Sequence, residues 1–263
     1  MIFDFFKYHG TGNDFVLIDN RRSDFPIDKN LIQQLCDRRF GIGADGMILI
    51  SYKDGCDFEM NYYNSDGNIG SMCGNGGRCA VAFANKLQII GDHAKFHAVD
   101  GLHQAQILKK DKNIYLVKLK MLDVKSVRKN NDALIINTGS PHYINFTSNL
   151  NDLDVNKEGR KIRNNEQFIA KGINVDFVEI HKDHLSVRTY ERGVENETLS
   201  CGTGVIASAI AYASREDKEG LFNIQSRGGM LKVMFIKSDD TFTDIWLEGP
   251  SEFVFKGKFE INI

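Results

Sequence analysis

Short segments in which apolar residues alternate with polar ones, or form brief uninterrupted runs, recur along the chain. At lengths of about four to eight residues such segments predict strands. The strands expected on this basis are 3–7, 15–19, 47–51, 58–62, 95–99, 105–108, 114–120 and 185–190. The first two are joined by the turn His9-Gly10-Thr11-Gly12-Asn13.

Two segments have helical character instead. Residues 27–40 place Leu31, Ile32, Leu35 and Cys36 on one face, which predicts a short amphipathic helix. Residues 76–88 are rich in alanine and end in polar residues. Residues 123–132 are polar and charged, and are the best candidate for a linker.

Composition narrows the class of protein. A length of 263 residues suggests one large domain or two modest ones, and 42% hydrophobic residues suffice for a full core. A formal net charge of -2 gives no reason to expect nucleic acid or an anionic membrane as partner. Residues 1–20 mix charged with apolar residues, so they do not resemble a signal peptide, and no apolar run is long enough for a membrane span. Five irregularly spaced cysteines argue against a disulfide scaffold and favour the reducing cytoplasm.

The two halves of the chain share a series of similar segments. We match Asn13-Asp14-Phe15-Val16 with Asn174-Val175-Asp176-Phe177-Val178, and Tyr63-Asn64-Ser65 with Tyr190-Glu191-Arg192. Cys73-Gly74-Asn75-Gly76 then matches Cys201-Gly202-Thr203-Gly204, and small apolar residues follow both. The order predicts two similar α+β domains, each with a cysteine at the start of a helix.

A thiol at a helix start has a chemical use. The first N–H groups of a helix lack partners within it and attract negative charge. We therefore expect a lowered pKa for both thiols and a cradle of N–H donors for a carboxylate or enolate oxygen. Two thiols, one from each half, are a suitable base and acid for inverting a stereocentre by proton transfer.

Other residues have plainer interpretations. We expect Cys36 and Cys79 to pack in the core, and we assign Cys56 no role. His142 lies in a turn between the halves, where a lone histidine is more often solvated than functional. The cysteines lack the spacing of a zinc site, the pair His181 and His184 is too isolated for a metal site, and no dinucleotide or phosphate loop is present.

Seven motifs follow one another in order: HGTGNDFVLID, GIGADG, YNSDG, MCGNGGRC, GSPH, YERG and SCGTG. In these motifs the chain resembles the diaminopimelate epimerase family over essentially its whole length. The resemblance implies an enzyme without metal or cofactor that interconverts LL- and meso-2,6-diaminopimelate for lysine and cell-wall synthesis. It implies an α+β fold of two pseudo-symmetric domains, each a curved mixed sheet wrapped around a central helix. We expect the domains at 1–122 and 123–252, with the last strand, 253–263, returning to the first, and we allow for a homodimer.

The resemblance also implies roles for individual residues. Cys73 and Cys201 are similar to the two acid/base thiols of the family. The residues expected to contact the substrate are Asn13, Asn64, Gly74, Asn75, Asn174, Glu191, Arg192, Gly202 and Thr203, with His142 as a supporting group. Gly46 and Ser140 differ from the residues that are common in the family at those positions. The resemblance therefore predicts the contacts to the distal end of the substrate less completely than the contacts to the reacting centre.

Three other functions are compatible with parts of the pattern. A proline or hydroxyproline racemase uses the same two-thiol logic, but its substrate lacks the distal carboxylate that Arg192 suits. A thiol redox or metal-sensing protein would use Cys73 with Cys79, whose spacing fits neither a CxxC motif nor a usual metal site. An amino-acid-binding protein would bind without exchanging the α-proton with solvent.

Overall fold

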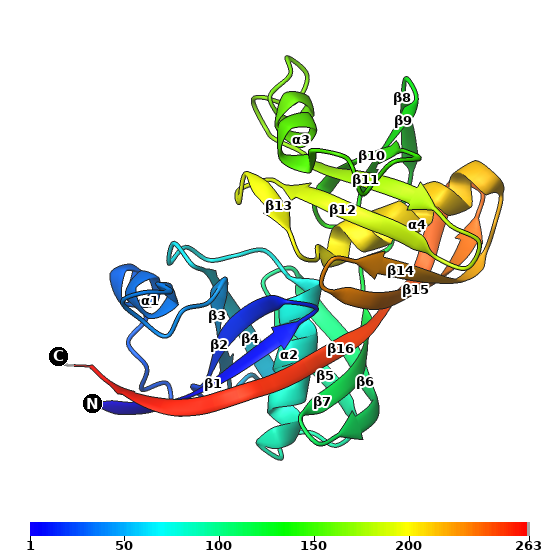
Figure 1. Cartoon of the computed structure of the whole chain (residues 1–263). Coiled ribbons are helices and arrows are strands. Elements are labelled where there is room, and N and C mark those ends of the chain that lie inside the picture. The colour runs from blue at the N-terminus through cyan, green and yellow to red at the C-terminus, as the bar shows by residue number, and fades with distance from the viewer. Residues whose placement is uncertain (262–263) are drawn as a thin grey trace. The chain divides into compact units, whose positions relative to one another are not determined.

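The computed structural model describes residues 1–261 and divides the chain into two compact units. Unit 1 comprises Met1–Leu119 and the chain from Gly249 onward, and unit 2 comprises Lys120–Glu248. Figure 1 shows the helices and strands of both units. Strand β16 (Thr241–Glu260) contributes its first part to unit 2 and its remainder to unit 1.

Unit 1 is a sheet that closes on itself. Its strands are hydrogen-bonded in the order β1-β2-β3-β4-β5-β6-β7-β16, and β16 also pairs with β1. The pairs β2–β3 and β4–β5 are parallel, and the other pairs are antiparallel. The strands are β1 (Ile2–Gly10), β2 (Asn13–Asp19), β3 (Gly46–Ser51), β4 (Phe58–Asn64), β5 (His93–Ala98), β6 (Gly101–Asp111) and β7 (Ile114–Lys120).

Helix α2 (Gly74–Lys86) is the centre of unit 1. Every residue from Gly74 to Ala84 is buried, and the helix packs against β1, β2, β3, β4 and β6. Phe83 lies 4.9 Å from Phe6 and 6.0 Å from Tyr8, measured between ring centroids. A helix buried on all sides needs small and apolar residues all round, which explains its glycines and alanines. The shorter α1 (Lys29–Cys36) begins at Asp28, whose side chain accepts a hydrogen bond from the Leu31 N–H.

Unit 2 repeats this arrangement around α4 (Gly202–Glu216). The sheet order is β16-β15-β14-β12-β11-β10-β9-β8, and α4 packs against β9, β10, β11, β12, β14 and β15. The strands are β8 (Val127–Asn130), β9 (Ala133–Asn137), β10 (Pro141–Phe146), β11 (Asn174–Ile180), β12 (Leu185–Glu191), β13 (Asn196–Thr198), β14 (Gly220–Ser226) and β15 (Gly229–Ser238). Helix α3 (Val155–Arg163) connects β10 to β11, as α1 connects β2 to β3.

The topology confirms the predicted fold class, a repeated α+β unit with a mixed sheet around a central helix. It shows that one of our sequence matches is wrong. Asn13 is the first residue of β2, whose counterpart is β10, whereas Asn174 is the first residue of β11, the counterpart of β3. The structural counterpart of Asn174 is therefore Gly46, the first residue of β3.

Some segment ends also differ from the sequence prediction. The first helix is shorter than 27–40, and α2 begins at Gly74 rather than Gly76 because Cys73 already caps it. Residues 123–132 contain β8 and are not simply a linker. The last strand pairs with β1 from Glu252 to Glu260, and residues 262–263 of the expected strand lie outside the described part of the chain. Among residues 1–261, no helix is both long and apolar enough to cross a membrane.

We predict that Phe83→Ala lowers the free energy of unfolding by about 3–5 kcal/mol, because it leaves a cavity between α2 and β1. Phe83 is completely buried, whereas Phe40 is 85% exposed. Phe40→Ala is therefore the matched control, with an expected change within about 0.5 kcal/mol. Urea unfolding of both variants measures the difference. Equal losses would contradict a core organised around α2.

Candidate active site

Cys73 and Cys201 occupy the same position in the two units. Each is the residue directly before its central helix and has an extended backbone, with φ -110° and ψ 120° at Cys73 and φ -114° and ψ 109° at Cys201. The Gly76 N–H donates to Cys73 Sγ at 3.5 Å. Both cysteines occupy the N-cap position of their helices, as the sequence predicts, but the side chain of Cys201 makes no capping hydrogen bond of this kind.

Asn13 and Asn75 lie beside Cys73. The Cys73 thiol donates to Asn13 Oδ1 at 3.6 Å, and Asn75 Nδ2 donates to the same oxygen at 3.3 Å. Thr11 Oγ1 donates to Asn75 Oδ1 at 3.4 Å. Three of the residues expected from the sequence thus form one hydrogen-bonded group at the start of α2.

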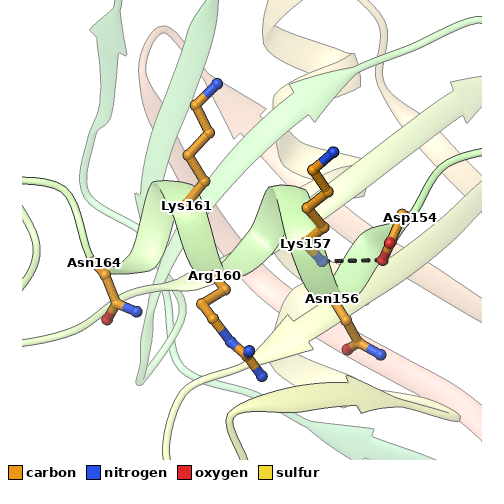
Figure 2. Close-up of a pocket in the computed structure, with 6 residues that line it drawn as sticks. All are labelled: Asp154, Asn156, Lys157, Arg160, Lys161 and Asn164. Carbon is orange, nitrogen blue, oxygen red and sulfur yellow. Dashed lines mark hydrogen bonds between the residues drawn. The ribbon is translucent and has the colours of Figure 1, made fainter.

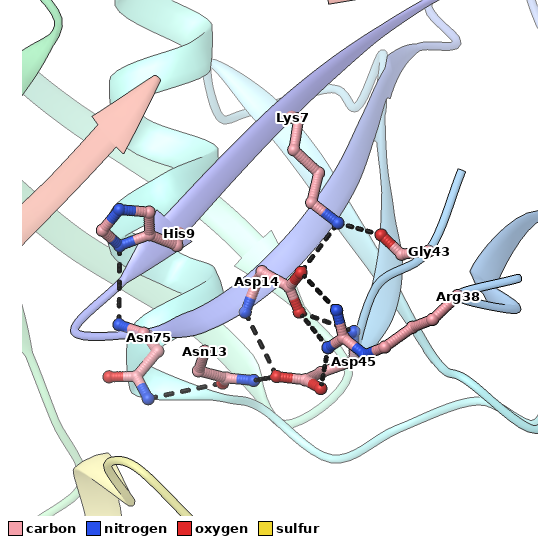
Figure 3. A network of polar contacts seen from close by, with 9 residues as sticks. Lys7, His9, Asn13, Asp14, Arg38, Gly43, Asp45 and Asn75 are labelled. Atoms are coloured by element: carbon pink, nitrogen blue, oxygen red, sulfur yellow. Dashed lines mark hydrogen bonds and ion pairs between the residues drawn. The ribbon is translucent and has the colours of Figure 1, made fainter. Parts of the chain in front are cut away.

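Charged residues support this group from β1, β2 and the connection between α1 and β3, as Figure 3 shows. Asn13 Nδ2 donates to Asp45 Oδ2 at 2.7 Å, which fixes the orientation of the Asn13 amide. Arg38 binds both Asp14 and Asp45 at 2.7 Å. The buried Lys7 pairs with Asp14 at 2.8 Å and also donates to the Gly43 carbonyl oxygen. No local sequence pattern marks this network, because its members are separated by up to 38 positions.

Burial alone would raise the pKa of Asp14, but hydrogen bonds from Arg38 and Lys7 outweigh it and lower this pKa from 3.8 to about 2. Asp14 is therefore a permanent anion at neutral pH. It holds Arg38 in place, and Arg38 in turn holds Asp45 against Asn13.

Asn64 ends β4 and pairs in register with Gly46. A Cβ atom at Gly46 would lie 2.5 Å from Tyr62 Cε2, and one at Gly70 would lie 2.4 Å from Tyr62 Cε1. The Tyr62 ring therefore fills the space between the two glycines, so position 46 has no room for a side chain. A cavity of about 130 Å³ borders Tyr62 and Gly70. The sequence analysis noticed Gly46 but not the ring that requires it.

A chain of hydrogen bonds surrounds Cys201 in unit 2. Cys201 Sγ lies 3.4 Å from Thr203 Oγ1, which lies 2.9 Å from His142 Nε2. His142 Nδ1 lies 2.6 Å from Asp176 Oδ2, and Thr189 Oγ1 donates to Asp176 Oδ1 at 2.6 Å. His142 and Asp176 are both completely buried.

The position of His142 corrects the expectation of a solvated loop histidine. It lies in β10, next to β11, which carries Asp176. The network assigns its tautomer: Nδ1–H donates to Asp176, so Nε2 accepts from the Thr203 hydroxyl. Thr203 Oγ1 is then free to accept from the Cys201 thiol.

The pKa of Cys201 is also contrary to the sequence prediction. Burial, and then the negative charges of Glu191 and Asp176, raise the pKa of Cys201 well above the usual value of 9.0. Hydrogen bonds from Thr203 and from the Gly204 N–H act in the opposite direction but are weaker. The helix start does favour the thiolate, but desolvation and two nearby carboxylates outweigh that effect.

Asn174 connects the other expected residues of unit 2. Its Nδ2 lies 2.9 Å from Ser140 Oγ and 3.3 Å from His142 Nε2, and its Oδ1 accepts from the Arg192 backbone N–H at 2.8 Å. Arg192 Nη2 donates to Ser140 Oγ at 3.4 Å. Glu191, the last residue of β12, directly precedes Arg192. The hydroxyl of Ser140 is thus a hydrogen-bonding partner of both Asn174 and Arg192.

Gly202 and Thr203 open α4 as Gly74 and Asn75 open α2. The Thr138 hydroxyl donates to the Thr203 carbonyl oxygen at 3.0 Å and fastens this turn to the end of β9. Gly204 follows, and a Cβ atom there would lie 2.3 Å from Asp176 Oδ1. The helix start can approach Asp176 only because this residue is glycine.

The remaining cysteines have ordinary surroundings. Cys36 and Cys79 are buried, as predicted, and burial raises the pKa of each to about 12. The Cys56 thiol donates to the Phe58 carbonyl oxygen at 3.2 Å. Within residues 1–261, no group of three or more His, Cys, Asp or Glu side chains is arranged to hold a metal ion.

A second hollow lies along α3, whose residues are distant in the sequence from Cys73 and Cys201. Figure 2 shows this hollow, which is lined by Asp154, Asn156, Lys157, Arg160, Lys161 and Asn164. Asp154 Oδ1 accepts from the Lys157 N–H at 3.0 Å and caps the helix. Its lining includes neither a cysteine nor a histidine, and we do not assign chemistry to it.

The chain matches the family model described as diaminopimelate epimerase over residues 5–126 and 134–254. It is 50% identical over 254 residues to a diaminopimelate epimerase from Flavobacterium psychrophilum, covering 95% of this chain and 98% of that one. It is 40% identical over 257 residues to one from Chlorobaculum tepidum, covering 94% and 98%.

Solved structures share the fold at much lower identity. A phenazine biosynthesis protein of the PhzF family from Bacillus anthracis has a TM-score of 0.77 at 15% identity, covering 99% of this chain and 100% of that one. A probable proline racemase from Agrobacterium radiobacter has a TM-score of 0.73 at 14% identity, covering 99% and 93%. These likenesses concern the fold alone.

We predict that Gly204→Ala destabilises the protein by about 1–3 kcal/mol. Alanine normally favours a helix interior over glycine by about 1 kcal/mol. Here its Cβ would collide with Asp176 Oδ1, which accepts a hydrogen bond from Thr189 Oγ1, while His142 Nδ1 holds the other oxygen of the same carboxylate. Gly91→Ala is the control, because nothing lies within 4 Å of a Cβ there. Thermal unfolding compares the two, and a Gly204 variant as stable as wild type would refute the close approach.

We predict that Asp14→Asn removes part of the acid sensitivity of the fold. The pKa of Asp14 is lower when folded, so its stabilisation is complete above about pH 4 and is lost as the pH falls toward 2. The advantage of wild type over the variant should shrink by roughly 2 kcal/mol across that window. Urea unfolding at several pH values measures it, with Asp4→Asn as an exposed control. A constant difference between wild type and Asp14→Asn would contradict the prediction.

Proposed function

The chain belongs to the diaminopimelate epimerase family, and we propose that it interconverts LL- and meso-2,6-diaminopimelate with Cys73 and Cys201 as the acid/base pair. One observation carries the assignment of the pair: each unit presents a cysteine as the cap of its buried central helix, followed at once by glycine.

The reaction needs two proton transfers at one carbon. One sulfur takes the α-proton as the C–H bond breaks, and the electron pair delocalises into the substrate carboxylate. The other thiol then delivers its proton to the opposite face, which inverts the centre and leaves the two sulfurs with exchanged protonation states. The transfer consumes no oxidant or reductant.

The helix starts supply the electrostatic part of the catalysis. Charge builds on the carboxylate when the α-proton leaves, and N–H groups fixed in advance stabilise that charge without reorganising. We assign this role to the backbone of Gly74, Asn75, Gly202 and Thr203. Glycine directly after each cysteine leaves the approach to these N–H groups free of a side chain.

The structure of unit 2 supports Cys201 as the proton donor in the resting enzyme. Its raised pKa favours the thiol, because burial and the charges of Glu191 and Asp176 outweigh the opposing hydrogen bonds. Cys73 is then the base in the direction that starts from this state, and the roles are reversed in the other direction. His142 acts through Thr203: Asp176 fixes the imidazole tautomer, and the imidazole orients the hydroxyl.

We assign the remaining predicted residues to substrate binding. Asn13, Asn64 and Asn174 suit the amino groups and carboxylates of the substrate, since an amide both donates and accepts. Arg192 suits the distal carboxylate, which its planar guanidinium can bind with two parallel hydrogen bonds. Glu191 suits an ammonium group. A cytoplasmic location belongs to the same proposal, and a homodimer stays a prediction.

Incubation with LL-diaminopimelate in heavy water tests the function. We predict that deuterium enters the α-carbon and that the meso isomer accumulates, followed by mass spectrometry and chiral separation. Binding without deuterium incorporation would indicate an amino-acid-binding protein instead. Turnover of proline in place of diaminopimelate would indicate a racemase.

Single alanine variants test the pair of thiols. We predict that Cys73→Ala and Cys201→Ala each lower epimerisation by roughly a hundredfold or more, because neither can pass a proton across the carbon. Each keeps one thiol, so deuterium can still enter one isomer without conversion to the other. Cys56→Ala is the matched control and should retain activity. Near-wild-type epimerisation by either catalytic variant would rule out the two-thiol mechanism.

A further inference from the structure

Arg78 is the largest completely buried side chain described in the protein. It lies in the first turns of α2, five residues after Cys73. Its guanidinium donates to the Gly74 carbonyl oxygen at 3.1 Å, to Asn75 Oδ1 at 2.8 Å and to the Pro250 carbonyl oxygen at 3.3 Å. All three acceptors are uncharged. A buried cation without a carboxylate partner costs stability, so its retention calls for a reason.

The negative charges that act on this cation come from thiols. Burial lowers the pKa of Arg78 to about 10, while Cys79 and Cys73 oppose that effect. The guanidinium is therefore still charged at neutral pH. Burial keeps Cys79 protonated, with a pKa of about 12. Of the two thiols, Cys73 is therefore the one whose deprotonated form Arg78 can stabilise.

Other charged groups near the start of α2 are already paired. Asp14 and Asp45 share Lys7 and Arg38, and His9 faces Glu252 at 3.6 Å. Burial raises the pKa of Tyr8, so this phenol is neutral. Among these cations, Arg78 is the one whose described hydrogen-bond acceptors are all uncharged.

Arg78 is also linked to Cys73 by hydrogen bonds. Because Arg78 and Thr11 both donate to Asn75 Oδ1, the Asn75 NH₂ group must face Asn13. Asn13 Oδ1 then accepts from Asn75 and from the Cys73 thiol. The guanidinium therefore sets the orientation of two amides that lie against the sulfur.

Unit 2 has no such cation at the corresponding place. The residue five positions after Cys201 is Ile206, which is completely buried. The buried charge near Cys201 is instead the carboxylate of Asp176. The two helix starts share a backbone conformation but place opposite charges near their sulfurs.

We propose that Arg78 is the positioning residue of Cys73 and the fixed counter-charge of the thiolate that forms there when the Cys73 proton leaves. The inference rests on the proposed function and deepens it, because it assigns a supporting residue to one thiol of the same catalytic pair. Arg78 needs no contact with substrate for this role. It acts through its charge and through Asn75 and Asn13.

The rate of Cys73 alkylation by iodoacetamide as a function of pH, without substrate, tests the proposal. Mass spectrometry distinguishes the label on Cys73 from that on the other cysteines. We compare wild type with Arg78→Met, which removes the charge, and with Arg78→Lys, which keeps it. Arg188→Met is the matched control, since Arg188 also donates to two backbone carbonyl oxygens, those of Leu150 and Leu153, but in unit 2.

We expect Arg78→Met to slow Cys73 alkylation at pH 7 by roughly tenfold and to move its pH midpoint upward by about one unit. Arg78→Lys should stay within about threefold of wild type in alkylation. Its epimerase kcat should still fall, because a lysine cannot hold Asn75 and two carbonyl oxygens together. If thermal unfolding shows that Arg78→Met does not fold, Arg78→Gln replaces it as the neutral variant.

Two outcomes would overturn the proposal. One is that a folded neutral variant shows the same dependence of Cys73 alkylation rate on pH as wild type. The other is an equal loss of reactivity in the lysine and neutral variants, which would make packing rather than charge the cause. Because alkylation needs no substrate, the result stands apart from the heavy-water experiment: failure of epimerisation would reject the proposed function and leave the thiol measurement valid.

Discussion

Complete burial of a helix inside a curved sheet determines where chemistry can occur in each unit. From Gly74 to Ala84 every residue of α2 is buried, and most of α4 is buried in the same way. Most residues of such a helix must be small or apolar, so its sides offer little chemistry. The unpaired N–H groups at its start remain, and each unit places a cysteine there. The packing requirement and the catalytic requirement therefore select the same glycine- and alanine-rich sequence.

The electrostatics of the two helix starts differ although their backbones agree. Helix dipoles favour an anion at both, by about 0.3–1 kcal/mol for an exposed group. Burial of Cys201 near Asp176 and Glu191 outweighs this, and its pKa rises. In unit 1 the completely buried cation of Arg78 interacts with Cys73 instead. A repeated fold can thus surround its two thiols with opposite charges.

Local signals in the sequence were sufficient for the main elements. The cysteine and glycines before an alanine-rich segment predict both helix starts, and the fold class follows from the repeated order of segments. Similarity of short segments was misleading for Asn13 and Asn174, because both precede a strand but not the equivalent one. The buried pair of His142 and Asp176 joins residues 34 positions apart, and no local pattern marks such a contact. The position of Cys201 at a helix start does not predict the direction of its pKa shift, because burial within the folded unit is the largest cause of that shift.

The strand registers explain how one scaffold accommodates these opposite charges. In unit 1, Phe15 of β2 is in register with Gly46 of β3, and Ile48 of β3 is in register with Tyr62 of β4. In unit 2 the same register places His142 beside Asn174, and Asp176 opposite Thr189. An apolar trio of Phe15, Ile48 and Tyr62 in one unit thus corresponds to the hydrogen-bonded trio of His142, Asp176 and Thr189 in the other.

The third residue after each cysteine, Gly76 or Gly204, faces the respective trio closely. In unit 2 the buried charge near the cysteine, Asp176, lies on the sheet, and in unit 1 the buried Arg78 lies on the helix, where unit 2 has the apolar Ile206. The buried charge near the sulfur therefore differs in sign between the two units, although the backbone at the two helix starts has the same conformation. A few interior side chains therefore give the surroundings of the two cysteines opposite charges, while both units keep the same fold.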